Sequence, residues 1–98
     1  MRKRKYSNLF RKVLRKIKGK ELQNILNKLD EISASENLDH YKNLSKGLKK
    51  YKRVHVNNSY VILFFGDNNM VYFLDYAHHD IVYEHNKKSF KKYENLEF

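Results

Sequence analysis

The sequence contains no cysteine and no proline, and only three of its 98 residues are glycine. The lack of cysteine excludes thiol catalysis, disulfides and thiolate zinc sites. With no proline and little glycine, we expect regular helices and strands joined by short turns. No apolar run approaches the roughly 18 residues of a membrane span, and the basic N-terminus is not followed by the apolar stretch of a secretion signal. We therefore expect a cytoplasmic protein with no membrane partner.

Acidic residues are scarce, with 11 Asp and Glu against 21 Lys and Arg, which gives a formal net charge of +10. Residues 1–20 hold ten Lys or Arg and no acid, and the segment Lys42–Arg53 adds six more, again without an acid. Clustered positive charge predicts affinity for polyanions, because neutralising phosphates releases their counterions. The alternative is a charge that only keeps the protein soluble.

Apolar residues recur at helical spacing after a short basic segment, residues 1–6, which is either a brief edge strand or a loose arm. Ser7 is a favourable N-cap, and Gly19 is suited to end a first helix. A second helix is predicted from Lys20. The two apolar stripes are Leu9, Phe10, Val13, Leu14 and Ile17, then Leu22, Ile25, Leu26, Leu29 and Ile32. Because so little chain separates the helices, we expect an antiparallel α-hairpin over residues 7–34.

The pattern changes to that of β-strands from Leu48 onwards. Segments rich in Val, Ile, Tyr and Phe predict strands at Leu48–Val56, Tyr60–Phe65 and Met70–Tyr76. The residues between them are Asn57-Asn58 and Gly66–Asn69, which are typical of tight turns that tolerate positive φ. Such short connections predict an antiparallel meander, with the wholly apolar segment Tyr60–Phe65 as its central strand.

Helices followed by strands predict an α+β fold in which the N-terminal antiparallel α-hairpin packs on one face of a small, mainly antiparallel β-sheet. The length suits a single domain, residues 1–98, with the sheet in residues 48–83 and a tail in residues 84–98. In the tail, the spacing of Phe90, Tyr93 and Leu96 predicts a short helix.

Alternation along Leu48–Val56 divides its side chains between two faces. Tyr51, Arg53 and His55 share one face, whereas Lys50, Lys52 and two valines share the other. The valines predict that the second face packs on the helices, which leaves the first exposed. Bases stack on tyrosine and arginine binds phosphate, so an exposed face of this kind favours RNA binding. The alternative is an ordinary solvated face.

The segment His78-His79-Asp80, followed by Tyr83, carries the strongest candidates for chemistry. One interpretation is acid–base or phosphate chemistry, because imidazoles that titrate near neutral pH in a cationic protein suit RNA cleavage. A second is a structural role in a turn. A third is a metal site, which we disfavour because neighbouring residues on a strand point apart. We therefore expect no metal and no small-molecule cofactor.

Taken jointly, several segments resemble the RelE/ParE toxin superfamily, and more narrowly the archaeal RelE-like toxins. After the basic α-hairpin come Tyr41–Leu48, Tyr51–Val56, a strand with Tyr60, and finally Ala77–Tyr83. The resemblance covers the chain up to about Tyr83. It implies a β-α-α-β-β-β order and the toxin half of a type II toxin–antitoxin pair.

Many such toxins cleave mRNA in the ribosomal A site without metal, through attack of the ribose 2′-hydroxyl on the neighbouring phosphate. The resemblance therefore implies an endoribonuclease, or mRNA interferase, whose partners are mRNA, the ribosome and a cognate antitoxin polypeptide. The alternatives are a ParE-like toxin that inhibits a protein target such as gyrase, or an RNA-binding module without catalysis.

The resemblance also implies roles for individual residues. His79 would be the general base or acid, and Tyr83 would stack on the base or assist proton transfer. Arg53 and His55 would line the substrate face. The remaining candidates are Lys49, Lys50 and Lys52 near phosphates, Asp80 orienting an imidazole, and Tyr51 and His78 as further RNA contacts, with His78 ranked below His79.

The sequence departs from the family pattern at two places. Many RelE-like toxins have arginine directly after the tyrosine that matches Tyr60, where this chain has Val61. Many also have arginine in the segment that matches His78-His79. The chain therefore resembles the nucleases that use histidine, and Arg53 is left as the bidentate cation expected on the sheet.

Overall fold

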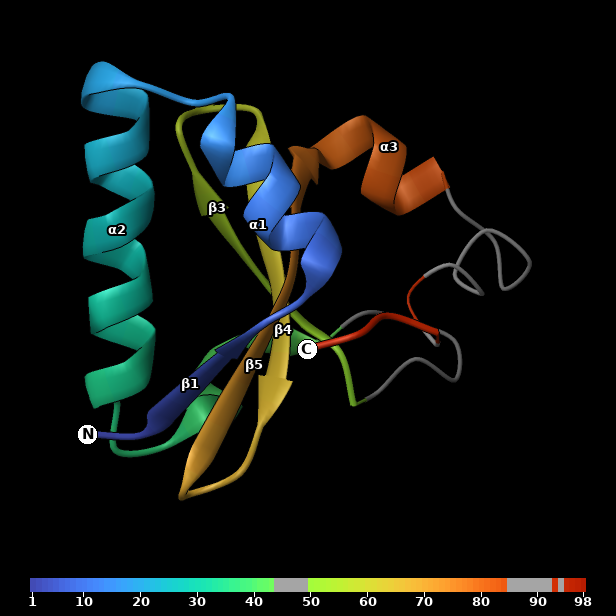
Figure 1. Ribbon diagram of the computed structural model, residues 1–98. Helices are drawn as coiled ribbons and strands as arrows, with labels where there is room; N and C mark the ends of the chain where they lie inside the picture. The colour runs from blue at the N-terminus through green and yellow to red at the C-terminus, as the bar shows by residue number, and fades with distance from the viewer. Residues whose placement is uncertain (44–49, 85–92, 94) are drawn as a thin grey trace.

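The computed structural model describes residues 1–43, 50–84, 93 and 95–98; for residues 81, 83 and 84 it describes the backbone alone (Figure 1). The elements within these residues follow in the order β1 (Lys3–Tyr6), α1 (Asn8–Arg15), α2 (Gly19–Ala34), the 3-10 turn η1 (Leu38–His40), β2 (Lys42–Asn43), β3 (Lys52–Val56), β4 (Tyr60–Gly66), β5 (Met70–His78) and α3 (His79–Glu84). Among the described residues, no helix is long and apolar enough to cross a membrane.

The five strands form one mixed sheet in the order β1-β5-β4-β3-β2. Strands β2 to β5 pair antiparallel with their neighbours, whereas β1 pairs parallel with β5, with Lys3 opposite Met70. Strand β4 is therefore central, and all four residues Val61–Phe64 are fully buried. The predicted meander and its buried middle strand are confirmed. The initial segment is a strand at the sheet edge rather than a loose arm.

Helices α1 and α2 lie on the same side of the sheet (Figure 1). Their apolar stripes contribute to one core cluster, in which Phe10, Ile25, Leu29 and Ile32 meet sheet residues such as Phe64. This arrangement confirms the predicted α+β fold with helices covering one face. Its stability comes mainly from removing these large side chains from water.

Helix α1 ends earlier than the sequence suggested. Its N-cap is Ser7 as predicted, with the hydroxyl oxygen accepting a hydrogen bond from the Phe10 N–H at 2.9 Å. Its last residue, however, is Arg15, so the prediction that Gly19 caps it was wrong. Gly19 is instead the first residue of α2 and has a φ of 65°. Gly19 does lie at the break between the two helices, as predicted, but it begins the second helix and does not end the first.

The two hairpin turns have the chemistry that their sequences predict. Asn57 and Asn58, between β3 and β4, have φ values of 56° and 62°. In the β4–β5 turn the Asp67 carboxylate accepts hydrogen bonds from the N–H groups of Asn69 and Met70 at 2.8 and 3.0 Å. These bonds lower the pKa of Asp67. Both turns thus fix the strand register that places the ends of β4 and β5 together.

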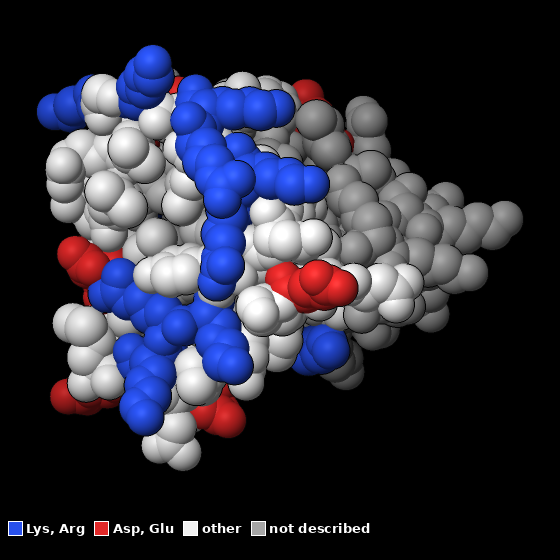
Figure 2. Space-filling view, in the orientation of Figure 1, with Lys and Arg blue, Asp and Glu red and all other residues white. Residues whose placement is uncertain are grey.

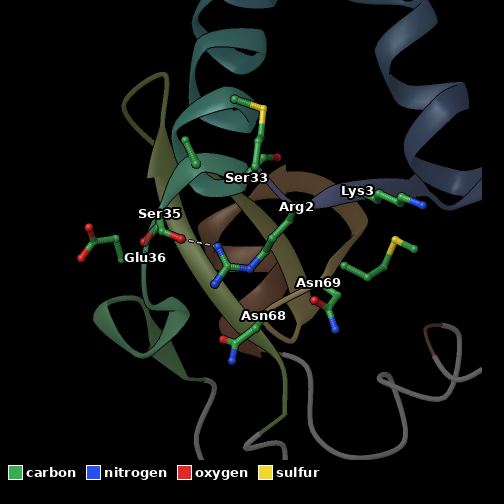
Figure 3. A pocket seen from close by; sticks show the side chains of 10 residues that line it. Arg2, Lys3, Ser33, Ser35, Glu36, Asn68 and Asn69 are labelled. Atoms are coloured by element: carbon green, nitrogen blue, oxygen red, sulfur yellow. Dashed lines mark hydrogen bonds between the residues drawn. The ribbon is translucent and has the colours of Figure 1, made fainter.

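Arg2, directly before β1, binds the residues that follow α2 and β4. Its side chain is buried, and its Nε donates to the Asp67 carbonyl at 2.6 Å while the guanidinium also donates to the Ser35 carbonyl. Its backbone N–H donates to the Ser33 carbonyl at 3.0 Å. Figure 3 shows Arg2 in the hollow between the end of α2 and the β4–β5 turn. The internal bonds account for this cation, so we assign the hollow a structural role.

The second face of the sheet is also covered, which the sequence did not predict. Helix α3 and C-terminal residues form a second core cluster on it, made of Tyr51, Val61, Leu63, Leu74, Val82 and Tyr93, with Leu96 packed against it. The predicted open face is therefore wrong at Tyr51, which is only 5% exposed. The tail helix predicted from Phe90 to Leu96 falls largely outside the described residues.

Candidate functional site

The candidate site lies where β5 ends and α3 begins. His78 is the last residue of the strand and His79 the first residue of the helix. This change of backbone conformation brings adjacent side chains together, and the two imidazole rings stack with centroids 4.7 Å apart. The argument that neighbouring residues point apart holds within a strand and was wrong here, because the strand ends between them.

Asp80 faces both histidines. Its Oδ1 lies 3.0 Å from Nδ1 of His79, and its Oδ2 lies 3.7 Å from Nδ1 of His78. Its backbone N–H donates to Nδ1 of His78 at 3.1 Å. The carboxylate is thus in position to orient the His79 ring. The His78 acceptor caps the first turn of α3 in the manner of an N-cap side chain.

Strands β3 and β4 complete the surroundings. The N–H of His79 donates to the Ser59 carbonyl, in the β3–β4 turn, at 2.8 Å. The His55 ring, on β3, has its centroid 6.0 Å from that of His79. Three imidazoles and a carboxylate, from β3 and from the β5–α3 junction, therefore meet at one end of the sheet. His55 is exposed, and His78 and His79 are half-buried.

Two tyrosines adjoin the histidines and were not among the predicted site residues. Tyr60 stacks on Tyr76 with centroids 5.0 Å apart and meets the His78 ring edge-on at 5.4 Å. The Tyr76 hydroxyl donates to Glu21 at 2.9 Å. Burial, together with a hydrogen bond to Glu21 and its charge, raises the pKa of Tyr76 to about 12. Tyr60 could have been placed at the site from its pairing with His78 across β4 and β5. That pairing depends on a strand register that the sequence alone does not give.

A hollow of about 360 Å³ opens beside these tyrosines, between α1 and the sheet. It is lined by Leu9, Lys12, Val13, Lys16, Ile17, Glu21, Tyr60 and Tyr76. Figure 2 shows a band of Lys and Arg running over α1 and β1 on this side of the molecule. The exposed Lys and Arg residues of β1, of α1 and of the position after α1 are Lys3, Lys5, Arg11, Lys12, Arg15 and Lys16. A polyanion would meet a continuous positive surface next to the candidate site.

The other predicted residues are placed unevenly. Arg53, on the same face of β3 as His55, is half-buried. Lys50 is exposed, with its Nζ 5.0 Å from the ring centroids of both Tyr51 and Phe65. Lys49 lies outside the described residues, and for Tyr83 only the backbone, within α3, is described.

Tyr51 and Lys52 are turned into the protein, which disagrees with the RNA contacts predicted for them. Tyr51 packs edge-on against Phe65, with centroids 6.0 Å apart. Lys52 is 8% exposed, and its Nζ donates to Asn43 at 2.7 Å and lies 3.6 Å from the Asp39 carboxylate. A buried ammonium that is already paired in this way is poorly placed to neutralise a phosphate.

Comparison with known proteins assigns the chain to a family. The chain is 44% identical over 85 residues to a protein of Methanocaldococcus jannaschii named "Putative toxin RelE4", covering 82% of this chain and 87% of the relative. It is 42% identical over 76 residues to an uncharacterised protein of Methanosarcina mazei, covering 76% and 85%. No family model matches the chain.

Two solved structures share the fold. YafQ from Escherichia coli BL21(DE3) aligns with a TM-score of 0.58 at 16% identity, covering 85% of this chain and 99% of YafQ. A chain of the toxin–antitoxin complex RelBE2 from Mycobacterium tuberculosis aligns with a TM-score of 0.54 at 20% identity, covering 79% and 96%. The architecture is thus that of YafQ and of this RelBE2 chain. The chain belongs to the RelE toxin family.

Proposed function

We propose that this RelE-like toxin is an endoribonuclease that cleaves mRNA on the ribosome, without a metal ion, by attack of a ribose 2′-hydroxyl on the adjacent phosphate. The observation that carries the proposal is the contact between His79 and Asp80, with the His55 ring 6.0 Å from that of His79. Cleavage of this type needs one group to remove the 2′-hydroxyl proton and another to protonate the departing 5′-oxygen. Two imidazoles near one phosphate can supply both.

His79 is the proposed general base. Its Nδ1 lies 3.0 Å from Asp80, so an Nδ1–H directed at that carboxylate makes Nε2 the ring nitrogen that takes the proton. Asp80 then stabilises the imidazolium that forms. His55 is the proposed general acid, which protonates the 5′-oxygen as the phosphorus–oxygen bond breaks. The products are a 2′,3′-cyclic phosphate and a 5′-hydroxyl.

Positive charge around the site would hold the substrate. Arg53 precedes His55 by two residues on the same face of β3, which suits a cation near the scissile phosphate. The band of exposed Lys and Arg over α1 and β1 offers phosphate contacts farther away (Figure 2). Binding of this kind weakens steeply as salt is added. Tyr83 is proposed to stack on a base or to assist proton transfer, the two roles that the family resemblance implies.

We also propose that a cognate antitoxin polypeptide binds and silences the protein in the cytoplasm. The fold shared with a chain of the RelBE2 toxin–antitoxin complex supports this partner. The net charge of +10 suits a partner with acidic segments. Isolation of the natively expressed protein should therefore recover a second small polypeptide in stoichiometric amount.

The test is cleavage of mRNA on programmed ribosomes with EDTA present, comparing the wild type with His79→Ala. Loss of a general base should lower the cleavage rate by about 10²- to 10⁴-fold. The matched control is His40→Ala, which removes an exposed imidazole from η1, far from the site, and should cleave normally. End analysis should find cyclic phosphates in the wild-type product.

Two results would contradict the proposal. Equal cleavage by wild type and His79→Ala would remove His79 from the chemistry. Growth arrest in cells without any RNA cleavage would instead favour a toxin that acts on a protein target. Comparing His79→Ala with Tyr83→Phe in an RNA-binding assay separates catalysis from affinity, because both variants of a nuclease should bind RNA nearly as the wild type does.

A further inference from the structure

The two histidines and the aspartate at the β5–α3 junction also have the composition of a metal-binding cluster. One ligand atom from each of His78, His79 and Asp80 lies within 4.8 Å of the other two. Ligands about 2.1 Å from a tetrahedral zinc ion lie roughly 3.4 Å from one another. The Asp80 and His79 atoms, at 3.0 Å, are already inside that spacing. Small side-chain rotations would bring the His78 ligand atom to the same spacing from the other two.

The Nδ1 atoms of the two histidines both lie near the same carboxylate. Asp80 is 3.0 Å from one Nδ1 and 3.7 Å from the other, through its two oxygens. Three ligand side chains on three consecutive residues therefore converge, because the strand ends between the histidines. The carboxylate is 63% exposed and each imidazole about one-third exposed, so an ion can enter from solvent.

We propose that His78, His79 and Asp80 form a binding site for a divalent transition-metal ion of the zinc class, with water in the remaining position. Two imidazoles and one carboxylate match the ligands that Zn²⁺ accepts, whereas Mg²⁺ and Ca²⁺ prefer all-oxygen sites. Binding replaces the hydrogen bond from the Asp80 N–H to His78 where Nδ1 of His78 is the ligand. Three coordinate bonds then replace that hydrogen bond and the contact between His79 and Asp80.

The positive charge of the rest of the chain disfavours binding of a cation, so zinc affinity should depend on salt in the opposite sense to RNA affinity. The net charge of +10 repels Zn²⁺ over long range, and added salt screens that repulsion. The coordinate bonds are contacts that salt screens little. Zinc affinity should therefore rise with a non-coordinating salt, whereas affinity for RNA falls.

The regulatory consequence rests on the proposed function. With zinc on Nδ1, the ring proton of His79 sits on Nε2, so the nitrogen proposed as the base has no lone pair with which to take the 2′-hydroxyl proton. Zinc is then a reversible inhibitor of the toxin that EDTA removes. Metal binding itself does not depend on nuclease activity, so the two ideas can fail separately.

The test is isothermal titration calorimetry of the intact chain with ZnCl₂ in a chelator-free buffer. We expect one ion per chain, no comparable binding of MgCl₂, and at least a tenfold loss of zinc affinity in His78→Ala and in Asp80→Asn. Asp80→Asn keeps the backbone N–H that binds His78, so it preserves the start of α3. His40→Ala is the matched control and should bind zinc as the wild type does. Circular dichroism checks that each variant is folded.

The proposed site would be overturned if Asp80→Asn bound zinc as tightly as the wild type, or if His40→Ala lost as much zinc affinity as the site variants. Either result would mean that zinc binds to exposed histidines in general. The cleavage assay then separates the two proposals. Zinc that binds with the expected variant pattern but leaves cleavage unchanged would refute His79 as the base and leave the metal site standing. Zinc inhibition that EDTA reverses, at concentrations matching the calorimetric affinity, is the result expected from both.

Discussion

A buried hydrogen bond between Tyr93 and Asp75 joins the C-terminal residues to the sheet. The Tyr93 hydroxyl donates to Oδ2 of Asp75 at 2.7 Å, and the two residues are only 3% and 4% exposed. Oδ1 of the same carboxylate accepts from the Tyr76 N–H at 2.8 Å. Burial, with the Asp75 charge adding to it, raises the pKa of the Tyr93 phenol, which therefore stays protonated as a donor.

The change Tyr93→Phe removes the hydroxyl and keeps the aromatic ring in the second core cluster. The ring's packing against Leu63 and Leu74 is retained, so the loss comes from the carboxylate oxygen deprived of this donor. Hydrogen bonds to charged groups contribute about 1.5–3 kcal/mol. We therefore expect the free energy of unfolding to fall by about 2 kcal/mol. This is a large share of the roughly 5–15 kcal/mol typical of a small domain.

Urea unfolding monitored by circular dichroism measures this loss. The matched control is Tyr72→Phe. Tyr72 is a partly exposed tyrosine of β5, the strand that carries Asp75, and it stacks on Phe65 with centroids 4.7 Å apart. That variant should stay within about 0.5 kcal/mol of the wild type. A similarly small change in Tyr93→Phe would refute the reasoning, because it would show that the Asp75 carboxylate does not depend on this donor in solution.

Three further predictions concern the framework of the site. Ser7→Ala should lower the free energy of unfolding by about 2 kcal/mol, measured in urea, because the buried hydroxyl caps α1 and also donates to the Leu74 carbonyl at 2.6 Å. Gly66→Ala should cost about 1–3 kcal/mol in the same assay, since the added Cβ would lie 2.4 Å from the Met70 carbonyl oxygen and force the turn to move; unchanged stability would contradict that crowding. Thermal denaturation should show stability falling between about pH 10 and pH 12, because unfolding releases the Tyr76 proton there while the folded state, with a pKa of about 12, retains it; the fall should be smaller in Tyr76→Phe.

The helices and the central strands could be predicted from local patterns. An apolar run bounded by turn residues identified β4, which pairs with a strand on either side. Asn57 and Asn58 marked a hairpin because asparagine tolerates the positive φ found there. In each case the signal and the structure concern neighbouring residues, so no tertiary information was needed.

The covered second face could not be predicted in the same way. It depends on Tyr93 reaching Asp75, two residues 18 positions apart whose attraction leaves no periodic pattern. The alternation along β3 correctly put Tyr51 and His55 on one face, but it could not say that chain from beyond β5 covers Tyr51. Sequence periodicity assigns a residue to a face; burial depends on which other segment packs there.

The histidine cluster shows the same limit within three residues. The residues His78-His79-Asp80 were recognised as candidates from the sequence. The directions in which their rings point, however, depend on where β5 ends, and the ends of elements are the least certain feature of a sequence-based prediction. The participation of Tyr60 followed from its pairing with His78, a register set by the three-residue turn after β3. Residue types were thus readable in advance, and their geometry was not.

The two proposals place opposite demands on His79, and this makes salt a useful variable. RNA approaches through phosphates, so its binding should weaken as salt screens the +10 charge, whereas zinc approaches against that charge and should bind more tightly. If both ligands use His79, raising the salt concentration should make a fixed zinc concentration a stronger inhibitor at subsaturating RNA. An inhibition that instead weakens in parallel with RNA binding would mean that zinc acts on the RNA or on the ribosome, since neither route requires an ion to approach the cationic protein.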